Sequence, residues 1–542
     1  MKTLTIGRNA ILAHNDKSGK PFIKICFPFN TDDLEFVRTL PDRKWNPDGK
    51  FWTTPLNVEV VERLMSCKFA MDLQLITYLE RTKLHISQVG HIDVPGLKGT
   101  LYPFQKQGVA FIEAKQGRVL IGDEMGLGKT IQALAWLQLH SELRPVVVVV
   151  PASLKLNWAR EATRWMPSPR CQILSGTNPD ARLIGEIIII NYDILSHWIG
   201  ELHRIDPQVL VLDEVHYVKN NAAKRTKAVK RLSKTIPHVL ALSGTPIVNR
   251  PVEIYNTIRL IDPTVMPSFW EYAHRYCAAR NNGFGWDFSG ASNTEELHDK
   301  LTHTIMIRRK KQDVLPDLPD KVRSFIPIEL DNEREYREAE KDFISFVMKR
   351  KGLEAAERAS NATTLAEIEG LKQLAVHGKL KQAISWITDF LESGNKLVVF
   401  AVHHFVIDAL MDEFRDIAVK VDGSVTGVNR QRYVDEFQTN PNIRLFVGNV
   451  KAAGIGITLT AASNVAFLEL PWTPGEVTQA EDRCHRIGQR DSVTIYYLLA
   501  SDTIEEQIAR LIDRKRKVLD SVLDGQETEQ ESLLSELMKM YE

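Results

Sequence analysis

The sequence has few cysteines, no long apolar run and no excess of charge. Its five cysteines among 542 residues form no CxxC pair and no metal-ligand spacing, which argues against a disulfide framework and favours a reducing compartment. The longest apolar runs, Val146–Val150 and Ile187–Ile190, are far shorter than the roughly 20 residues of a membrane-spanning helix. The first residues also lack the apolar core of a signal peptide. We therefore expect a cytoplasmic protein that has no membrane partner.

The charged residues cancel, because 69 Lys and Arg residues are matched by 69 Asp and Glu residues. A net charge of zero excludes a uniformly basic protein that coats nucleic acid, whereas it leaves room for a local basic track. Hydrophobic residues make up 44% of the chain and charged residues 25%, as in soluble globular proteins. The length exceeds that of a single hydrophobic core and predicts about three or four domains.

Two series of short apolar runs alternate with segments of helical periodicity. The alternation predicts two α/β domains, each with a parallel sheet covered by helices on both faces, and a ligand cleft between them. The predicted strands of the first series are 118–122, 146–151, 186–192, 208–214 and 238–244, and those of the second are 396–402, 417–423, 443–449, 464–470 and 492–499.

The remaining segments differ in composition from these two series. Residues 1–95 combine a strand-like run, a helical stretch and a turn-rich segment, which predicts a separate small α+β domain. Charged stretches with helical periodicity between the two series predict a mostly helical insertion and linker. The predicted domains are 1–95, a first lobe at 96–262, the insertion at 263–375, a second lobe at 376–525 and a polar tail at 526–542.

The amino-terminal segment 40–56 alternates basic and aromatic residues around a turn signal. Asp48–Gly49 lies between Trp45 and Trp52, which predicts a β-hairpin. On this pattern alone two interpretations stay open. Either the aromatic side chains form the core of a small domain, or the rings stack on nucleic-acid bases while the cations contact phosphates. The residues concerned are Arg43, Lys44, Trp45, Lys50, Phe51 and Trp52.

The segment GDEMGLGKT, residues 122–130, lies between a predicted strand and a predicted helix. Gly126 and Gly128 allow backbone amides to approach phosphate oxygens closely. Lys129 supplies positive charge at the β- and γ-phosphates, and the Thr130 hydroxyl is a ligand for Mg²⁺. The segment therefore predicts an ATP-binding loop.

An acidic pair, Asp213 and Glu214, follows the apolar run VLVL. The carboxyl end of a strand is where a parallel sheet presents ligand-binding groups. Asp213 is suited to hold Mg²⁺, and Glu214 to orient and deprotonate the attacking water. In isolation such a pair would equally well cap the following helix, but together with Lys129 it predicts a nucleotide hydrolase.

Four motifs, in their order along the chain, resemble those of the Swi/Snf-type ATPases of helicase superfamily two. They are DEMGLGKT, in which Asp123 stands where a P-loop has its first glycine, then DEVH, SGTP at 243–246 and QAEDRCHRIGQ at 479–489. The resemblance covers residues 98–525. It implies two RecA-like lobes that hydrolyse ATP with Mg²⁺ and act on DNA.

The resemblance also implies roles for residues outside the nucleotide loop. Arg483 and Arg486 are expected to be arginine fingers, which accelerate phosphoryl transfer by roughly 10³–10⁵-fold once the lobes close. The alternative for these two residues is a pair of surface salt bridges. Gln105 is the expected adenine contact. The expected coupling and DNA-contacting residues are Ser243, Thr245, Gly454, Gly456, Trp472 and Gln479.

The amino-terminal segment is similar to the HepA-related domain that precedes the motor in annealing helicases. This similarity favours the nucleic-acid interpretation of the aromatic and basic residues in segment 40–56. Three basic clusters, 308–311, 349–351 and 514–517, either line a phosphate track or form solvated helix faces.

These features predict an ATP-dependent translocase on double-stranded DNA that remodels or reanneals branched DNA. We expect a monomeric motor that contacts replication or repair proteins. We expect it to be associated with the nucleoid of a bacterium or with viral DNA in a host cell. One alternative is a conventional helicase that separates DNA or RNA strands. Another is a nucleotide-gated binding scaffold, against which the intact set of Lys129, Asp213, Glu214, Arg483 and Arg486 argues.

Overall fold

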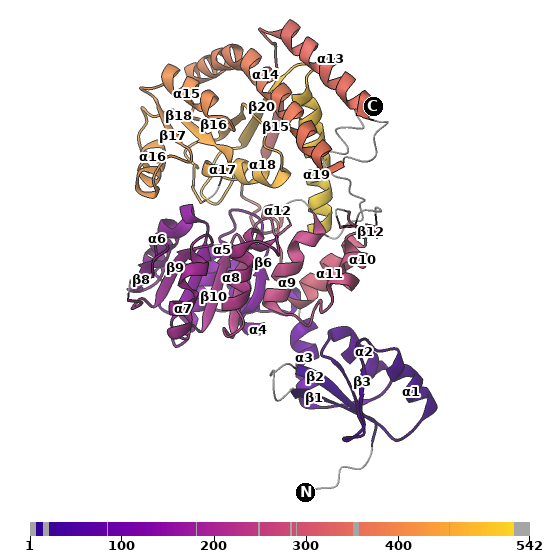
Figure 1. The fold of residues 1–542 in the computed structure, drawn as a ribbon. Helices are drawn as coiled ribbons and strands as arrows, with labels where there is room; N and C mark the ends of the chain where they lie inside the picture. Colours follow the sequence, from indigo (N-terminus) through magenta and orange to yellow (C-terminus); the bar gives the residue numbers. More distant parts are fainter. Residues whose placement is uncertain are drawn as a thin grey trace.

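The fold consists of a small amino-terminal unit and two larger lobes that stack on each other (Figure 1). It is given by a computed structural model. The residues described are 7–14, 21–83, 85–179, 182–247, 250–281, 285–288, 290–350, 357–454 and 456–524.

The amino-terminal unit is a five-stranded sheet packed against helices. Its order is β3-β4-β2-β1-β5, antiparallel except for the β1–β5 pair. The predicted hairpin is confirmed, because Trp45 and Trp52 are direct cross-strand partners and the Gly49 amide donates to Asn46 Oδ1 at 2.8 Å in the turn. The elements are β1 (Asn9–His14), β2 (Pro21–Cys26), α1 (Thr31–Arg38), β3 (Lys44–Asn46), β4 (Phe51–Pro55), α2 (Val58–Ser66), β5 (Ala70–Met71), α3 (Leu73–Lys83) and the 3₁₀ turn η1 (Ile86–Gln88).

The first lobe is a seven-stranded parallel sheet of order β14-β6-β11-β10-β7-β9-β8. The five predicted strands are confirmed; the sequence analysis missed the short edge strands β8 and β14. The strands are β6 (Arg118–Ile121), β7 (Val146–Val150), β8 (Cys171–Ile173), β9 (Ile187–Asn191), β10 (Val209–Asp213), β11 (His238–Leu242) and β14 (Met306–Ile307).

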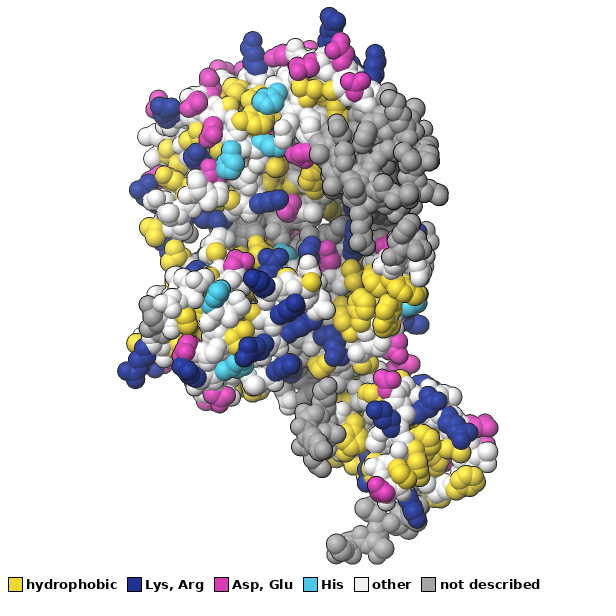
Figure 2. Space-filling model, viewed as in Figure 1, with side chains coloured by type: hydrophobic (Ala, Val, Ile, Leu, Met, Phe, Trp, Pro, Cys, Tyr) yellow, Lys and Arg dark blue, Asp and Glu magenta, His cyan; other side chains and the backbone are white. Residues whose placement is uncertain are grey.

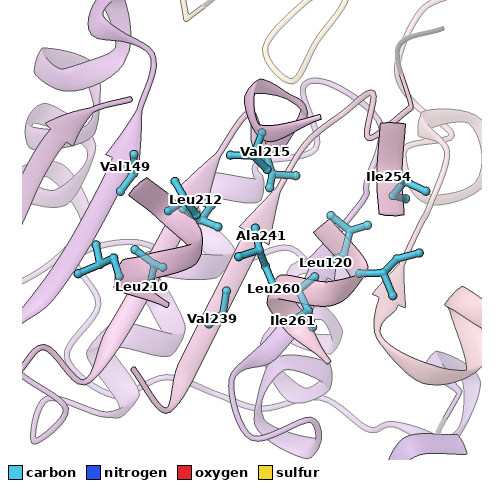
Figure 3. Close-up of a cluster of buried hydrophobic side chains, with 14 of the residues drawn as sticks. Leu120, Val149, Leu210, Leu212, Val215, Val239, Ala241, Ile254, Leu260 and Ile261 are labelled. Atoms are coloured by element: carbon cyan, nitrogen blue, oxygen red, sulfur yellow. The ribbon is translucent and has the colours of Figure 1, made fainter. Parts of the chain in front are cut away.

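Helices cover both faces of this sheet because successive side chains of each strand point to opposite sides. Leu210 and Leu212 of β10 pack toward one group of helices, as Figure 3 shows, while Val209 and Val211 pack toward the other. The first group is α7 (Leu195–Arg204), α8 (Lys224–Leu232) and α9 (Tyr255–Ile261); the second is α4 (Pro103–Ala114), α5 (Lys129–Leu139) and α6 (Lys155–Trp165); 3₁₀ turns are η2 (Ala152–Leu154), η3 (Val215–Val218) and η4 (Pro251–Ile254).

The segment between the two sheets contributes to both lobes. We expected a mostly helical insertion at 263–375, yet this segment also supplies β14 to the first sheet and β15 to the second. The predicted domain boundaries themselves stay predictions. The elements are α10 (Phe269–Tyr276), the hairpin β12 (Arg280–Asn281) and β13 (Trp286–Asp287), α11 (Thr294–Thr304), α12 (Lys311–Val314), β15 (Lys321–Ile328), α13 (Glu333–Arg350) and α14 (Glu357–Glu392).

The second lobe is a six-stranded parallel sheet of order β15-β20-β19-β16-β18-β17, which confirms the second predicted series. Its last helix, α19, also packs against α11 of the first lobe. The elements are β16 (Leu397–Ala401), α15 (His404–Glu413), β17 (Ala418–Val421), α16 (Gly427–Thr439), β18 (Leu445–Asn449), α17 (Val450–Ala453), β19 (Asn464–Phe467), α18 (Pro474–Glu481), β20 (Val493–Ala500) and α19 (Ile504–Asp524).

The predicted fold class, two parallel-sheet lobes with a small amino-terminal α+β unit, is thus confirmed. The loops that follow β6, β10 and β11 leave the first sheet at its carboxyl edge, where parallel sheets bind ligands. In Figure 1 this edge faces the second lobe. Functional groups from both lobes therefore meet there.

Candidate nucleotide site between the lobes

The loop between β6 and α5 has the conformation of a phosphate-binding loop. Gly126 and Gly128 have φ values of 88° and 78°, a region that side chains rarely adopt. A Cβ atom at Gly126 would lie 2.7 Å from the Cβ of Arg486, and one at Gly128 would lie 2.6 Å from Nε2 of Gln105. Glycine is therefore required at both positions by conformation and by space. Thr130 lines the cavity beside this loop.

The ammonium group of Lys129 is held inside the loop. Its Nζ donates to the carbonyl oxygens of Asp123 at 2.9 Å and Glu124 at 3.4 Å. Burial lowers the pKa of Lys129, an effect that Glu214 and other nearby carboxylates oppose. A partly buried cation at the amino terminus of α5 favours the binding of an anion, as does the dipole of the helix.

Asp213 ends β10 and is locked in place by two hydrogen bonds. Its Oδ2 accepts from Nε1 of Trp158 at 2.7 Å, and its Oδ1 accepts from the backbone amide of Glu214 at 2.9 Å. Burial, followed by the negative charge of Glu214, raises the pKa of Asp213 to about 6. A nearby cation would relieve this repulsion, so the carboxylate fits a Mg²⁺ ligand.

Glu214 has a buried carboxylate oxygen with no hydrogen-bond partner. Its backbone adopts a left-handed φ of 49°, and Oε2 is the orphaned atom. Burial raises the pKa of this residue. A buried polar atom without a partner is rare in proteins and marks a place where a water or ligand binds. The geometry thus fits the predicted role of Glu214 toward an attacking water.

A chain of short contacts connects Glu214 with the second lobe. Nδ1 of His216 lies 3.4 Å from Oε2 of Glu214 and 3.3 Å from Oγ of Ser243. The amide of Thr245 donates to the same Oγ at 3.2 Å. Nε2 of Gln479 then donates to Oγ1 of Thr245 at 3.0 Å, across the lobe interface. This path supports the expected coupling role of Ser243, Thr245 and Gln479.

The two candidate arginine fingers lie at the same cavity, although they belong to the second lobe. Arg483 is buried, donates through Nε to the Gln479 carbonyl at 3.0 Å and has Nη2 3.9 Å from Sδ of Met125. Arg486 is half-buried and donates to the Ile457 carbonyl at 3.2 Å. Burial, together with the like charge of Arg486, lowers the pKa of Arg483 to about 10. Neither guanidinium forms the surface salt bridge that was the alternative for this pair.

The cavity brings most of the predicted nucleotide-site residues together. Its volume is about 330 Å³. Residues of the first lobe and residues of the second lobe both line it, so the site is complete only when the lobes are close. The predicted residues in its lining are Gln105, Gly126, Gly128, Lys129, Thr130, Asp213, Glu214, Gly456, Arg483 and Arg486.

The expected adenine contact, Gln105, is buried beside the nucleotide loop. Its Nε2 donates to the Leu127 carbonyl at 3.2 Å, and its Oε1 accepts from the Tyr102 amide at 3.0 Å. Both atoms are thus satisfied by the protein itself. The adenine contact stays a prediction that the position of the side chain permits.

The other predicted coupling residues belong to the second lobe. Gly456 packs against Leu154 of the first lobe, and Gly454 follows α17. Trp472 is half-buried within the second lobe, where its Nε1 donates to Oε2 of Glu369 at 3.1 Å and its ring lies 4.5 Å from Nζ of Lys372. These contacts hold the indole in place, while its contact with DNA stays a prediction.

Asp123, the departure from the standard loop pattern, forms a buried ion pair. Nε of Arg309 donates to its Oδ1 at 3.0 Å, and Nη2 of Arg309 donates to Oδ2. Nε2 of Gln132 also donates to Oδ2, at 3.0 Å. The carboxylate thereby ties the nucleotide loop to the segment that leads into the second lobe, a role that a glycine cannot fill.

Replacing Asp123 with asparagine is expected to lower the free energy of unfolding by about 3–5 kcal/mol, because Arg309 would remain buried without a counter-charge. Urea unfolding followed by circular dichroism measures this change. Glu201→Gln is the matched control, since it breaks the exposed ion pair with Arg204, worth at most about 1 kcal/mol. If both variants lost the same free energy of unfolding, the structural role of the buried Asp123–Arg309 ion pair would be contradicted.

The interpretation of the basic clusters requires correction. Arg309 and Lys311 are buried, so they neither line a phosphate track nor form a solvated helix face. Nζ of Lys311 contacts Oδ1 of Asp482 at 2.9 Å and donates to the His485 carbonyl at 2.6 Å, joining the lobes. In the cluster 514–517, Lys515 is buried and Arg516 pairs with Glu481 and Asp513. The side chains of 349–351 lie outside the described residues.

Sequence reasoning missed the buried ionic network beneath the QAEDRCHRIGQ motif. Oε2 of Glu481 lies 2.7 Å from Nη2 of Arg323 and 3.0 Å from Nζ of Lys321, and these cations hold the pKa of Glu481 well below its usual range. Asp482 pairs with Lys321 and Lys311. The signal that could have revealed this network is the pair of adjacent acidic residues, Glu481 and Asp482, inside the motif.

The structure places His403 in a second ionic cluster. Its Nδ1 bonds with Oε1 of Glu469, and its Nε2 lies 3.1 Å from Oε1 of Glu369. The hydrogen bond to Glu469 raises the pKa of His403. Since Glu369 also accepts from Trp472, His403 supports the position of that indole.

Comparison with known protein families agrees with this geometry. Residues 104–382, just over half of the chain, match the SNF2-related domain, and residues 379–488 match the helicase conserved C-terminal domain. Within the described part of the chain, no helix has the length and apolar character needed to span a membrane.

Several curated proteins are similar to most of this chain. The SWI/SNF-related matrix-associated actin-dependent regulator of chromatin subfamily A-like protein 1 of Xenopus laevis is 35% identical over 464 residues, which cover 81% of this chain and 46% of the relative. Its Caenorhabditis elegans homolog is 32% identical over 524 residues, covering 92% and 74%. The DNA annealing helicase and endonuclease ZRANB3 of Mus musculus is 36% identical over 450 residues, covering 79% and 41%.

The chain spans less than half the length of the Xenopus and mouse relatives. The alignment with the nematode relative is long enough to include part of residues 1–95. The sequence resemblance to Swi/Snf-type ATPases is thus confirmed by the two domain matches and by these relatives. The chain belongs to the family of proteins that combine an SNF2-related domain with a helicase conserved C-terminal domain.

Proposed function

We propose that this protein is an ATP-dependent translocase on double-stranded DNA that remodels or reanneals branched DNA. The observation that carries the proposal is the composite cavity, in which Lys129 and Glu214 of one lobe face Arg483 and Arg486 of the other. A binding scaffold has no need of this arrangement. It suits a motor, because the groups that accelerate hydrolysis assemble only when the lobes close.

The residues of the cavity fit ATP and Mg²⁺. Thr130 and Asp213 offer the hard oxygen ligands that Mg²⁺ prefers, and the orphaned Oε2 of Glu214 lines the same space. When bound, Mg²⁺ and ATP would supply the phosphoryl group and neutralise part of its charge. Gly126 and Gly128 allow the backbone of the loop to approach phosphate oxygens closely.

The remaining steps belong to the side chains of the chain itself. Glu214 orients the attacking water and accepts its proton. Lys129, Arg483 and Arg486 stabilise the negative charge that develops on the transferred group. After hydrolysis the arginines no longer face the transferred anion, which favours opening of the lobes, and Gln479 transmits the change to Thr245. DNA held across both lobes is then gripped alternately, and the motor steps.

The mouse relative is a DNA annealing helicase and endonuclease, which supports the proposal that this chain acts on DNA and reanneals it. We infer no nuclease activity from it, because this chain spans only 41% of that relative. We also propose that the protein is monomeric and contacts replication or repair proteins. We propose that it is located at the nucleoid or on viral DNA.

Displacement of the third strand of a DNA triplex tests translocation on an intact duplex. We expect the protein with ATP to displace the third strand and to close a bubble of melted base pairs, without separating a long duplex. A conventional helicase, the alternative, would separate the duplex and leave the bubble open. A scaffold would do neither.

The amino-terminal unit is proposed as the element that engages branched or single-stranded DNA. Trp45 is 49% exposed and its ring lies 5.4 Å from that of Trp52, while Nζ of Lys24 lies 4.3 Å from the Phe51 ring. Exposed rings beside cations suit stacking on bases. The partly buried Trp52 also packs on the core of the unit, so the core interpretation holds for this ring, while base stacking is proposed for the exposed Trp45.

We expect Trp45→Ala to slow bubble closure by about ten-fold, since stacking on one base is worth about 1–3 kcal/mol. ATP turnover without DNA should stay unchanged. Trp270→Ala is the control, because Trp270 is 50% exposed but lies on the first lobe. Equal loss of closure and of turnover in the Trp45 variant would count against a separate role for this unit.

A further inference from the structure

Helix α8 carries a concentration of positive charge that the nucleotide site does not use. Residues 215–252 contain no Asp or Glu, in a chain whose net charge is zero. The side chains of Lys224, Lys227, Arg231 and Lys234 are exposed. We name these four residues the α8 basic stripe. None of them lines the nucleotide cavity.

The packing of α8 fixes the direction in which this stripe points. Ala228, Val229 and Leu232 are buried in the core of the first lobe, so the opposite side of the helix is turned to solvent. Lys224, Lys227 and Arg231 follow one another at intervals of three and four positions, which places them on one face of α8. Lys234 lies in the turn just after the helix, which ends at Leu232. From Lys224 to Arg231, seven positions along the helix, this face extends about 10 Å.

The charges of the stripe are not neutralised by carboxylates. Among the residues that the structure describes, no ion pair involves a member of the α8 basic stripe. Exposed arginines elsewhere, such as Arg204 and Arg334, do pair with glutamates. Figure 2 shows Lys and Arg side chains gathered on the front of the first lobe, in the area where Figure 1 places α8.

The chemistry of the stripe fits the backbone of a nucleic-acid duplex. One DNA strand presents a phosphate about every 3.4 Å along the helix axis, so the helical part of the stripe, about 10 Å long, spans roughly three phosphates, and Lys234 extends it beyond the helix. The surface lacks the apolar anchors that protein partners use, because no large hydrophobic side chain is exposed between residues 215 and 247. A polyanion is therefore the matching occupant.

We propose that the α8 basic stripe binds the phosphate backbone of a second duplex segment, an arm of branched DNA that lies beside the duplex held across the lobes. The stripe begins after η3, close to the lobe interface, and continues down the helix-covered side of the first lobe (Figure 1). A second arm of a junction can follow this side, whereas a linear duplex held across the lobes leaves it empty. This inference rests on the proposed action on branched DNA.

The test replaces all four side chains at once, in the variant K224Q/K227Q/R231Q/K234Q. Binding to a three-way DNA junction and to a linear duplex is measured as a function of salt. For the junction we expect the slope of log K against log salt to fall by about 3–4, at about 0.9 for each phosphate that is no longer neutralised. Affinity for the junction at low salt should fall by about ten-fold or more, and the linear duplex should change little.

The control variant R334Q/R415Q/R432Q/R510Q removes the same charge from exposed positions scattered over the second lobe. We expect it to leave the difference between junction and duplex intact. An unchanged junction slope in the α8 variant would overturn the inference, and so would equal losses on junction and duplex. If DNA did not stimulate ATP hydrolysis by the wild-type chain, the proposed function would be contradicted. The binding test would still be valid, because DNA binding does not require ATP turnover.

Discussion

Replacing Arg486 with alanine is expected to lower ATP turnover by about 10³–10⁵-fold while ATP binding is retained, because the arginine acts on charge that develops only in the transition state. Arg486 lies on the second lobe but lines the cavity formed by the nucleotide loop. Its Cβ approaches Gly126 so closely that a side chain there would collide with it. Steady-state phosphate release and equilibrium binding of a fluorescent ATP analogue measure the two quantities.

Arg490→Ala is the matched control, since Arg490 is an exposed arginine only four positions further along the chain. Turnover of this variant should match that of the wild type. Arg486→Lys should recover only a small part of the activity, because lysine keeps the charge but lacks the planar fork of the guanidinium. Near-normal turnover of Arg486→Ala would remove the residue from the catalytic set.

Replacing Glu214 with glutamine is expected to lower turnover by about 10²–10⁴-fold, the usual contribution of a general base. Glutamine keeps the shape of the side chain but cannot accept the proton of the attacking water. ATP affinity should stay the same or rise, because one negative charge near the phosphates is gone. Single-turnover hydrolysis, measured with enzyme in excess over ATP, isolates this step from product release.

The pH dependence of turnover offers a second readout of the same residue. Burial raises the pKa values of both Asp213 and Glu214. Both groups act in their charged form, so wild-type turnover should be lost as the pH falls through these raised values. Glu142→Gln, at an exposed carboxylate of the first lobe, should keep the full rate and the same profile. If Glu214→Gln kept the wild-type rate, the general-base assignment would be wrong.

The sequence predicted the sheets and the nucleotide loop well because these features are local. Runs such as Val146–Val150 are apolar at every position, as a strand covered on both faces must be. The glycines of residues 122–130 follow directly from phosphate binding. The missed strand β15 reads KVRSFIPI, in which polar and apolar residues mix as expected at the edge of a sheet, so its pattern did not stand out.

Partners distant in sequence were beyond prediction. Asp123 departs from the loop pattern, and its bond to Arg309, 186 positions away in the sequence, explains the departure. A run of basic residues has the same sequence pattern whether its side chains are solvated or buried. The sequence therefore predicts a surface position for Lys311, which is in fact buried against Asp482. By contrast, α8 holds exposed cations that the sequence analysis did not single out. The role of a cluster of basic residues can be assigned only when the burial of each side chain is known.

Zero net charge also has a physical consequence for the motor. The cations of the α8 basic stripe, which we propose to bind DNA, are concentrated locally, while buried carboxylates such as Glu481 and Asp482 balance structural cations at the lobe interface. A protein with weak overall attraction for DNA releases it more readily in each cycle. The neutral composition therefore agrees with a translocase and disagrees with a passive DNA coat.

The most direct test of the account is the rate of ATP hydrolysis by the wild-type chain with linear duplex DNA, forked DNA, single-stranded DNA and RNA, compared in parallel at one salt concentration. Lobe closure around duplex DNA predicts strong stimulation by linear and forked duplexes and little by RNA. Stimulation by RNA alone, or a rate that no nucleic acid changes, would contradict it.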